Sequence, residues 1–276
     1  MIRREIHFPG KKPHWLLISQ KEHARVSAMM ADRCLSEFGQ SVARYDLVAL
    51  RAELLAAIVH HDDGWVPWDA APHLDTKHHR PPSFREMRLE DVLPIWTSSI
   101  KTAAAEGPLA GLTVAGHFIA LLEASEKEFK SALARDWQQD MAALRDKWFA
   151  DWQGVHPTLP TLQLAAEALL WLQLFDVASL WLCSACPGQD EQFHQPLENY
   201  HFAPDSLLQT RFRTLDQPGH VTFIPWRLDV PELLLEADGQ IIPIREYHNM
   251  SELNEARQPH TVRWVLSNKR QLRAKK

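Results

Sequence analysis

Hydrophobic residues recur at helical spacing through the middle of the chain. Leu47, Leu50 and Leu54, for example, lie three or four residues apart, and a helix places residues at that spacing on one face. Ser19, just before the first such segment, is of the residue type that caps helix N-termini. The helices predicted in this way cover about residues 21–38, 45–59, 89–105, 109–122, 125–152 and 161–186.

Near both ends of the chain, hydrophobic and polar residues alternate instead, which predicts strands. Asp238-Gly239 separates two of these segments and is a strong signal for a tight hairpin turn. We expect the strands from the two ends to share one small antiparallel sheet that packs on the helices. The strands are predicted at about residues 3–7, 15–18, 221–224, 233–237, 241–247 and 262–266.

Two stretches show neither periodicity. Residues 60–84 read as a long loop, and long loops in compact domains are commonly functional. Residues 189–218 are irregular, with a short helix expected near residues 205–211. The 276 residues are therefore expected to form a single domain of the mainly α (α+β) class, with a helical core at about 20–186 and a strand-rich part at about 215–268.

Composition narrows the class of function. Hydrophobic residues make up 45% of the chain, and the net charge of −5 provides no basic field for binding nucleic acid. Three cysteines cannot form a disulfide framework, and the N-terminal sequence lacks the apolar run of a secretory signal, so a cytoplasmic protein is expected. Residues 164–186 are long enough to span a bilayer, but Glu167 and Asp176 within them favour a buried helix over a membrane span.

The 15 histidines prompt a search for metal ligands. His23, His61-Asp62, His117 and Asp176 are polar residues within or at the end of apolar helical segments, and they come from four different predicted helices. Helices packed side by side can aim such groups at one internal point, as in helical metalloproteins. Imidazole and carboxylate ligands suit Fe, Mn, Zn, Co or Ni, and such an ion would also neutralise Asp176, which is costly to bury.

The order of these residues resembles a known pattern. His, then His-Asp, then His, then Asp on successive helices is similar to the HD-domain superfamily of metal-dependent phosphohydrolases, over about residues 20–186. More narrowly, four segments resemble the bacterial family defined as domain of unknown function 3891, over nearly the whole chain. These segments read HHDDGWVPWDAAP, RPPSF, IWTSSI and LQLFDVASLWLC.

The HD resemblance implies a role for each residue. His117 would match a ligand of a second metal ion or a histidine that contacts phosphate. Two-metal members of the superfamily usually need one more histidine, and the further candidate here, His156, precedes a proline in a predicted loop. One ion is therefore at least as well supported as two. The residues that would match the ligands of the first ion are His23, His61, Asp62 and Asp176.

In a hydrolase of this type, a metal-activated water attacks the substrate. Asp63 or His60 could orient that water or act as the general base, although Asp63-Gly64 also reads as a simple turn at a helix end. The expected partner is a small phosphorylated or otherwise anionic molecule, because cationic side chains near the site could hold phosphate oxygens. The residues expected to bind this substrate are Lys21, Arg25, Trp65 and Arg80.

Other interpretations stay open. A di-iron oxygenase of the HD type would need a second complete metal site. A non-catalytic protein could keep the scaffold to bind a metal, a ligand or a partner, and buried His and Asp could also pair with one another without any metal.

Cys183 and Cys186 have redox spacing but lie at a predicted helix C-terminus, where thiolates are not stabilised. The sequence does not fix the oligomeric state.

Overall fold

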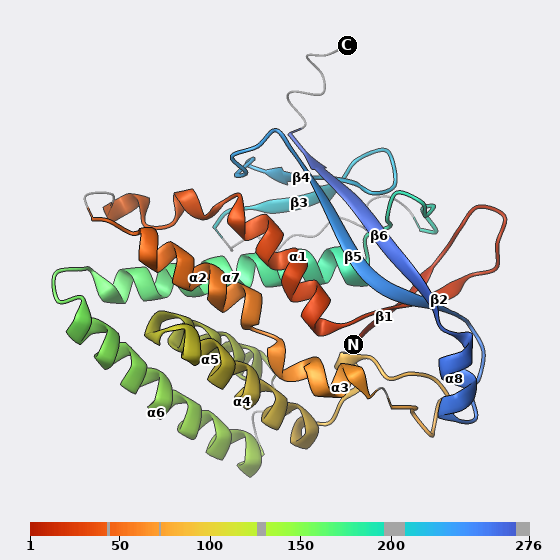
Figure 1. Cartoon of the computed structure of the whole chain (residues 1–276), viewed down its shortest axis with the longest axis horizontal. Helices are drawn as coiled ribbons and strands as arrows, with labels where there is room; N and C mark the ends of the chain where they lie inside the picture. The colour runs from red at the N-terminus through yellow and green to blue at the C-terminus, as the bar shows by residue number, and fades with distance from the viewer. Residues whose placement is uncertain (43–44, 72, 126–130, 196–207, 269–276) are drawn as a thin grey trace.

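The structure is a computed structural model, and it describes residues 1–42, 45–71, 73–125, 131–195 and 208–268. A group of helices packs against a sheet built from both ends of the chain (Figure 1). Within the described residues the sheet has six strands in the order β1-β2-β5-β6-β4-β3. The strands are β1 (Ile2–Ile6), β2 (His14–Ile18), β3 (Arg211–Thr214), β4 (His220–Ile224), β5 (Glu232–Pro243) and β6 (Gln258–Ser267).

The shared terminal sheet is confirmed, with one change in its pairing. β2 pairs with β5, which joins the N-terminal hairpin to the C-terminal strands, and most neighbours are antiparallel as predicted. β4 and β6 are parallel, so the sheet is mixed and not purely antiparallel. The architecture therefore combines helices with a mixed sheet.

The predicted hairpin at Asp238-Gly239 is wrong, because β5 runs unbroken through both residues. Gly239 pairs with Ile18 of β2 on one side and with His260 of β6 on the other. A Cβ atom at position 239 would lie 2.6 Å from the carbonyl oxygen of Leu17. The glycine is thus required for the close approach of β2 and not for a turn.

A helix that periodicity missed connects β5 to β6. This helix, α8 (Met250–Ala256), begins at Asn249, whose side chain accepts a hydrogen bond from the backbone N–H of Glu252. The Glu252 carboxylate in turn accepts from the backbone N–H of His248 at 3.1 Å. A cap residue followed three positions later by Glu is the sequence signal that could have predicted α8.

Most of the predicted helices are present, with shifted ends. α1 starts at the predicted cap, since the Ser19 hydroxyl accepts from the backbone N–H of Glu22, but it ends at residue 32 and not near 38. The predicted loop at residues 60–84 contains the short helix α3. The helices are α1 (Gln20–Asp32), α2 (Val48–His60), α3 (Val66–Ala70), α4 (Leu89–Glu106), α5 (Pro108–Ala124), α6 (Ala132–Val155) and α7 (Thr161–Ser184).

Two predicted segments reach beyond the described residues. The helix expected at 125–152 includes residues 126–130, which lie outside them, and α6 begins after Ser131, whose side chain caps it. The helix expected near 205–211 includes residues 205–207, which also lie outside. The described remainder is not helical, because Leu208 and Gln209 have positive φ angles and β3 starts two residues later.

The apolar helix α7 is the central element of the core. It is long and apolar enough to cross a membrane by length and composition, but 61% of its most apolar window is buried inside the protein. α7 contacts α1, α2 and α5 as well as β1, and Leu172 and Phe175 are fully buried. Burial among other elements therefore accounts for its hydrophobicity. The mutual contacts of α1, α2, α5 and α7 also bring their polar residues together.

Candidate metal centre

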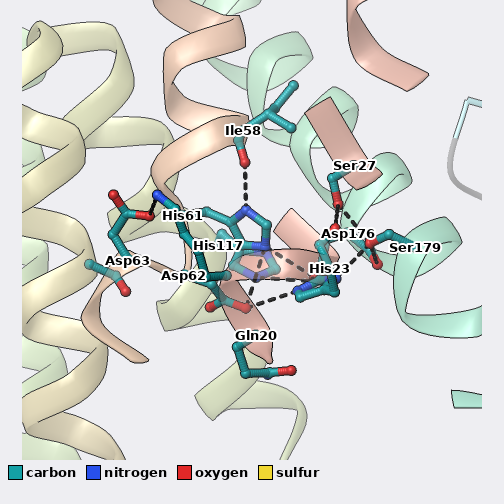
Figure 2. A network of polar contacts seen from close by, with 12 residues as sticks. Gln20, His23, Ser27, Ile58, His61, Asp62, Asp63, His117, Asp176 and Ser179 are labelled. Carbon is teal, nitrogen blue, oxygen red and sulfur yellow. Dashed lines mark hydrogen bonds and ion pairs between the residues drawn. The ribbon is translucent and has the colours of Figure 1, made fainter. Parts of the chain in front are cut away.

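Five polar side chains from these helices converge inside the core (Figure 2). His23 lies in the first turns of α1, His61 and Asp62 directly follow α2, His117 lies in α5, and Asp176 lies in the second half of α7. All five are buried. The residues predicted from the sequence as metal ligands thus lie together.

The inward-facing atoms of these residues lie within a few ångströms of one another. His23 Nε2 is 2.9 Å from Asp62 Oδ2 and 3.5 Å from Asp176 Oδ1. His61 Nε2 is 3.3 Å from Asp176 Oδ1 and 3.7 Å from Asp62 Oδ2. One ligand atom from each of His23, His61 and Asp62 forms a group whose members all lie within 4.8 Å of one another. Asp176 belongs to the same group, because its Oδ1 atom contacts the rings of both His23 and His61.

His61 is oriented by the backbone of its own helix. Its Nδ1 lies 2.8 Å from the carbonyl oxygen of Ile58, and because a carbonyl only accepts, Nδ1 carries the hydrogen. In a neutral ring, Nε2 then presents a lone pair toward Asp176 and Asp62. This Nε2 atom is buried and forms no hydrogen bond with any residue that the structure describes. Metal-binding histidines characteristically donate their second ring N–H to such a carbonyl.

His23 is oriented in the same sense by a serine on α7. Its Nδ1 lies 2.6 Å from Ser179 Oγ, and the Ser179 hydroxyl donates to the backbone carbonyl of Asp176 at 2.9 Å. On its inner side, His23 Nε2 forms a hydrogen bond with Asp62 Oδ2 at 2.9 Å, and because a carboxylate only accepts, Nε2 donates when no ion is bound. The Ser179 hydroxyl contacts the ring from the opposite side. Ser27 Oγ, 2.6 Å from Ser179 Oγ, extends this network.

Two imidazole nitrogens that face two buried carboxylates require a positive charge among them. Without a metal, protons must supply it: burial lowers the pKa of His61, but Asp62 and Asp176 outweigh burial and raise it to about 9. Burial raises the pKa of Asp176, and His61, His117 and His23 together lower it to about 2. A divalent cation supplies the same charge to all four groups, and the buried Nε2 of His61 fits such an ion.

His117 lies at the edge of this group. Its Nε2 is 3.8 Å from Asp176 Oδ2, and its Nδ1 is buried without a hydrogen bond to the described part of the chain. Burial lowers the pKa of His117, and the neighbouring His61 and His23 lower it further, against the opposing effect of Asp176. His117 is therefore a neutral imidazole next to the group, with one ring nitrogen facing Asp176.

The two residues expected to act on water lie together but apart from the cluster. His60 Nδ1 contacts Asp63 Oδ2 at 2.7 Å, and Lys21 forms an ion pair with the same carboxylate. Figure 2 shows Asp63 directed away from His61 and Asp62. His60, Asp63 and Lys21 thus form a partly exposed cluster of their own, and none of them lines the pocket described below.

A pocket of about 240 Å³ opens on the cluster. Asp62, His117 and Asp176 line it, while His23 and His61 lie behind these residues. Trp65 lines the pocket as predicted, but Arg25 and Arg80 do not. The other wall residues are Gln20, Phe84, Met87, Leu89, Val92, Trp96, Phe118, Leu121, Ser125 and Leu180.

The predicted cationic residues are held by carboxylates elsewhere. Arg25 pairs with Glu22 at 2.6 Å, and Arg80 pairs with Glu86 at 2.7 Å. Sequence reasoning missed Gln20, which precedes His23 by three positions and therefore lies on the same face of α1. It also missed Ser179, at the same spacing after Asp176 on α7. Residues on the face of a known candidate ligand are the signal that could have found both.

The environment of the cysteine pair does not favour redox chemistry. Cys183 and Cys186 are buried at the end of α7, and burial raises the pKa of the Cys183 thiol to about 12 and that of Cys186 as well. Since the thiolate is the reactive form, this burial and the place of the pair at a helix C-terminus both argue against a redox role.

A family model described as "Protein of unknown function (DUF3891)" matches residues 1–243. The chain belongs to this family. The match ends with the last residue of β5, so it contains all of the clustered residues and the whole pocket wall, whereas α8 and β6 follow it. No curated protein and no solved structure matches the chain.

Proposed function

We infer that this protein is a metal-dependent hydrolase of the HD-domain type that binds one divalent transition-metal ion. The ligands would be Nε2 of His23 and His61 and the carboxylates of Asp62 and Asp176. The observation that carries this proposal is the buried Nε2 of His61, which faces two carboxylates and has no hydrogen-bond partner among the described residues. Iron, manganese, zinc, cobalt and nickel all suit this ligand set.

When bound, an ion of this kind acts as a Lewis acid and activates water for hydrolysis. The residues of the chain have separate tasks around it. The Ile58 carbonyl and Ser179 hold the two histidine rings, and Asp62 and Asp176 present carboxylate oxygens at the pocket wall. His117, neutral and within the wall, is the group placed to accept or return a proton.

A single ion is favoured over the di-iron alternative. Within the described ranges, His23, His61 and Asp62 form one close group of potential ligands, and a second complete group is not found. The further histidine in the relevant interval, His156, lies just beyond the C-terminal end of α6 and contacts Trp152 at 6.1 Å between ring centroids. A small-molecule substrate and a cytoplasmic location remain predictions.

Metal analysis tests the proposal directly. The full chain is purified without a metal-chelating tag, and its metal content is measured as isolated and after reconstitution with each candidate ion. We expect about one equivalent in the wild type and almost none in the Asp62→Asn/Asp176→Asn variant. Asp63→Asn is the matched control, because this neighbouring carboxylate lies outside the group, and it should retain the ion.

Hydrolysis is then followed with the reconstituted protein on p-nitrophenyl phosphates, phosphodiesters and carboxylic esters. Turnover that requires the ion and disappears in the double variant supports the assignment. A wild-type protein that takes up no ion even after reconstitution would show that the buried His and Asp side chains only pair with one another.

A further inference from the structure

The pocket beside the candidate metal centre has mainly apolar walls. Trp65, Trp96 and Phe118 provide aromatic surface, and Val92 and Leu180 provide aliphatic surface. Trp96 stacks on Phe118 with ring centroids 5.0 Å apart, so this part of the wall is a preformed aromatic surface. Walls of this composition bind the apolar part of a ligand and leave orientation to a few polar groups.

The charges in the wall do not favour an anionic ligand. No Lys or Arg belongs to the described residues that line the pocket, and the two acids in its wall are Asp62 and Asp176. The nearby cations are already neutralised, since Lys21 pairs with Asp63. The carboxylates of Asp62 and Asp176 would offset the charge of a divalent ion bound between them, so a phosphate group would lose its hydration without gaining a cationic side chain from these walls. An uncharged ligand avoids that cost.

Gln20 provides a polar group for such a ligand. It is the first residue of α1, and its side chain lines the pocket although the residue is only 3% exposed. The backbone N–H of Gln20 donates to Asp69 Oδ2 at 2.8 Å, which fixes the start of the helix. The side-chain oxygen Oε1 is buried and has no hydrogen bond to the part of the chain that the structure describes. A buried acceptor left unpaired is costly, and a hydrogen-bond donor of a ligand would satisfy it.

We propose that this pocket binds an uncharged amide with an aromatic or branched apolar group, and that the N–H of this amide donates a hydrogen bond to Gln20 Oε1. The inference rests on the proposed function and names the substrate class of the same site. Hydrolysis of such an amide consumes one water. The water oxygen bonds to the acyl carbon, the bond from that carbon to the amide nitrogen breaks, and one proton of the water passes to the departing amine.

A pair of hydroxamic acids tests the apolar requirement. Acetohydroxamic acid and benzohydroxamic acid carry the same metal-binding group and differ in the apolar substituent. Their dissociation constants are measured by calorimetry with the zinc-loaded full chain, with phenyl phosphate as the anionic comparison. We expect benzohydroxamic acid to bind at least about tenfold more tightly than acetohydroxamic acid, because the pocket buries its ring. Phenyl phosphate should bind more weakly than benzohydroxamic acid.

Substitutions in and outside the pocket test whether the hydroxamic acids bind there. Leu121 lines the pocket and is 42% exposed, so Leu121→Lys should be tolerated by the fold and should remove most of the preference for the ring. Leu234, 49% exposed on β5 and outside the pocket, provides the matched control Leu234→Lys. Gln20→Met should weaken both hydroxamic acids about fivefold without loss of bound zinc.

The outcomes separate this inference from the proposed function. Equal affinity for the two hydroxamic acids, or tighter binding of phenyl phosphate, would overturn the substrate class while leaving the metal centre intact. Benzamide, which lacks a strong metal-binding group, is titrated into metal-free protein as well. If benzamide binds there and zinc adds nothing to the hydroxamic acids, the apolar pocket is supported and the metal centre is overturned. If neither compound binds in either state, the pocket assignment itself is wrong.

Discussion

Two sets of buried charges in this protein differ in how completely they are paired. Arg4 donates to Glu191 through both terminal nitrogens, each at 2.6 Å, and its Nε donates to the carbonyl of Cys183 at 3.0 Å. The Glu191 carboxylate also accepts from the backbone N–H of Gly188 at 2.8 Å. At the candidate metal centre, by contrast, the buried Nε2 of His61 faces carboxylates with no hydrogen bond to the described residues.

The difference distinguishes a structural ion pair from a ligand site. Every inward-facing group of the Arg4–Glu191 pair has a partner in the chain, so the pair needs nothing further. The centre around His61 holds its rings from outside, through Ile58 and Ser179. On the inner side His23 Nε2 contacts Asp62, whereas His61 Nε2 has no hydrogen bond to the described residues. Four changes test this comparison, in order of decreasing effect.

Breaking the structural pair should have the largest effect on stability. Glu191→Ala leaves the buried guanidinium of Arg4 unpaired, and we expect the free energy of unfolding to fall by about 3–5 kcal/mol, measured in urea. The double variant Arg4→Met/Glu191→Leu removes both charges and should recover much of this loss. A double variant as unstable as the single one would show that the pair itself, and not the stranded charge, sets the stability.

Removing an inner ligand should abolish metal binding. We expect His61→Ala to weaken the binding of zinc at least about a hundredfold, since it deletes an atom that contacts the ion, measured by competition with a chromophoric chelator. His60→Ala is the matched control, because His60 contacts Asp63 and not the cluster. Unchanged zinc affinity in His61→Ala would contradict the assignment of the centre.

Removing Ser179, which contacts the His23 ring from outside the centre, should lower the affinity for zinc by less. In Ser179→Ala the Nδ1 atom of His23 loses its hydrogen-bond partner, and zinc affinity should fall about tenfold to a hundredfold. Ser27 Oγ contacts Ser179 and the backbone carbonyls of His23 and Phe175 but not the ring of His23, so Ser27→Ala should change the affinity by less. Equal losses in the two variants would show that the serines act by packing and not by orienting His23.

The smallest expected effect is on the stability that Glu86, a carboxylate near the surface, contributes. Burial raises the pKa of Glu86, but the side chain of Arg3, the backbone N–H of Ser83 and the charge of Arg80 lower it overall. A lowered pKa in the folded state contributes stability at pH values above the unfolded pKa, and this contribution is lost as the pH falls through the folded pKa. The stability difference between wild type and Glu86→Gln should therefore be present at pH 7 and shrink in acid. A difference that stays constant down to pH 3 would contradict the pairing.

The buried polar residues of the cluster could be predicted because their signal is local. A histidine or aspartate within an apolar helical segment is unusual whatever surrounds it, and His23, His117 and Asp176 were found in that way. The arrangement of charges around the site could not be predicted. Whether Arg25 faces the pocket depends on Glu22 beside it and on the backbone of Glu236 from β5, to which it donates at 2.7 Å.

The fold predictions divide in the same way: those that rest on neighbouring residues succeeded, and one that depends on a distant strand failed. Hydrophobic periodicity located the helices, because the side chains that face the core repeat with the turn of the helix itself. The hairpin prediction at Asp238-Gly239 failed because a glycine permits a turn and also permits the close approach of another strand. Gly239 permits the close approach of β2, and this can be recognised only once β2 is known to lie beside β5.

By itself, the sequence determined the helices, the cap at Ser19 and the polar residues that were to be buried. These features depend on the chemistry of a few neighbouring residues. Only the tertiary structure decided that Nε2 of His61 has no hydrogen bond among the described residues, that the predicted cations pair elsewhere and that Gln20 lines an apolar pocket. Each of these depends on which faces of distant segments meet, and that is settled by the packing of the whole core.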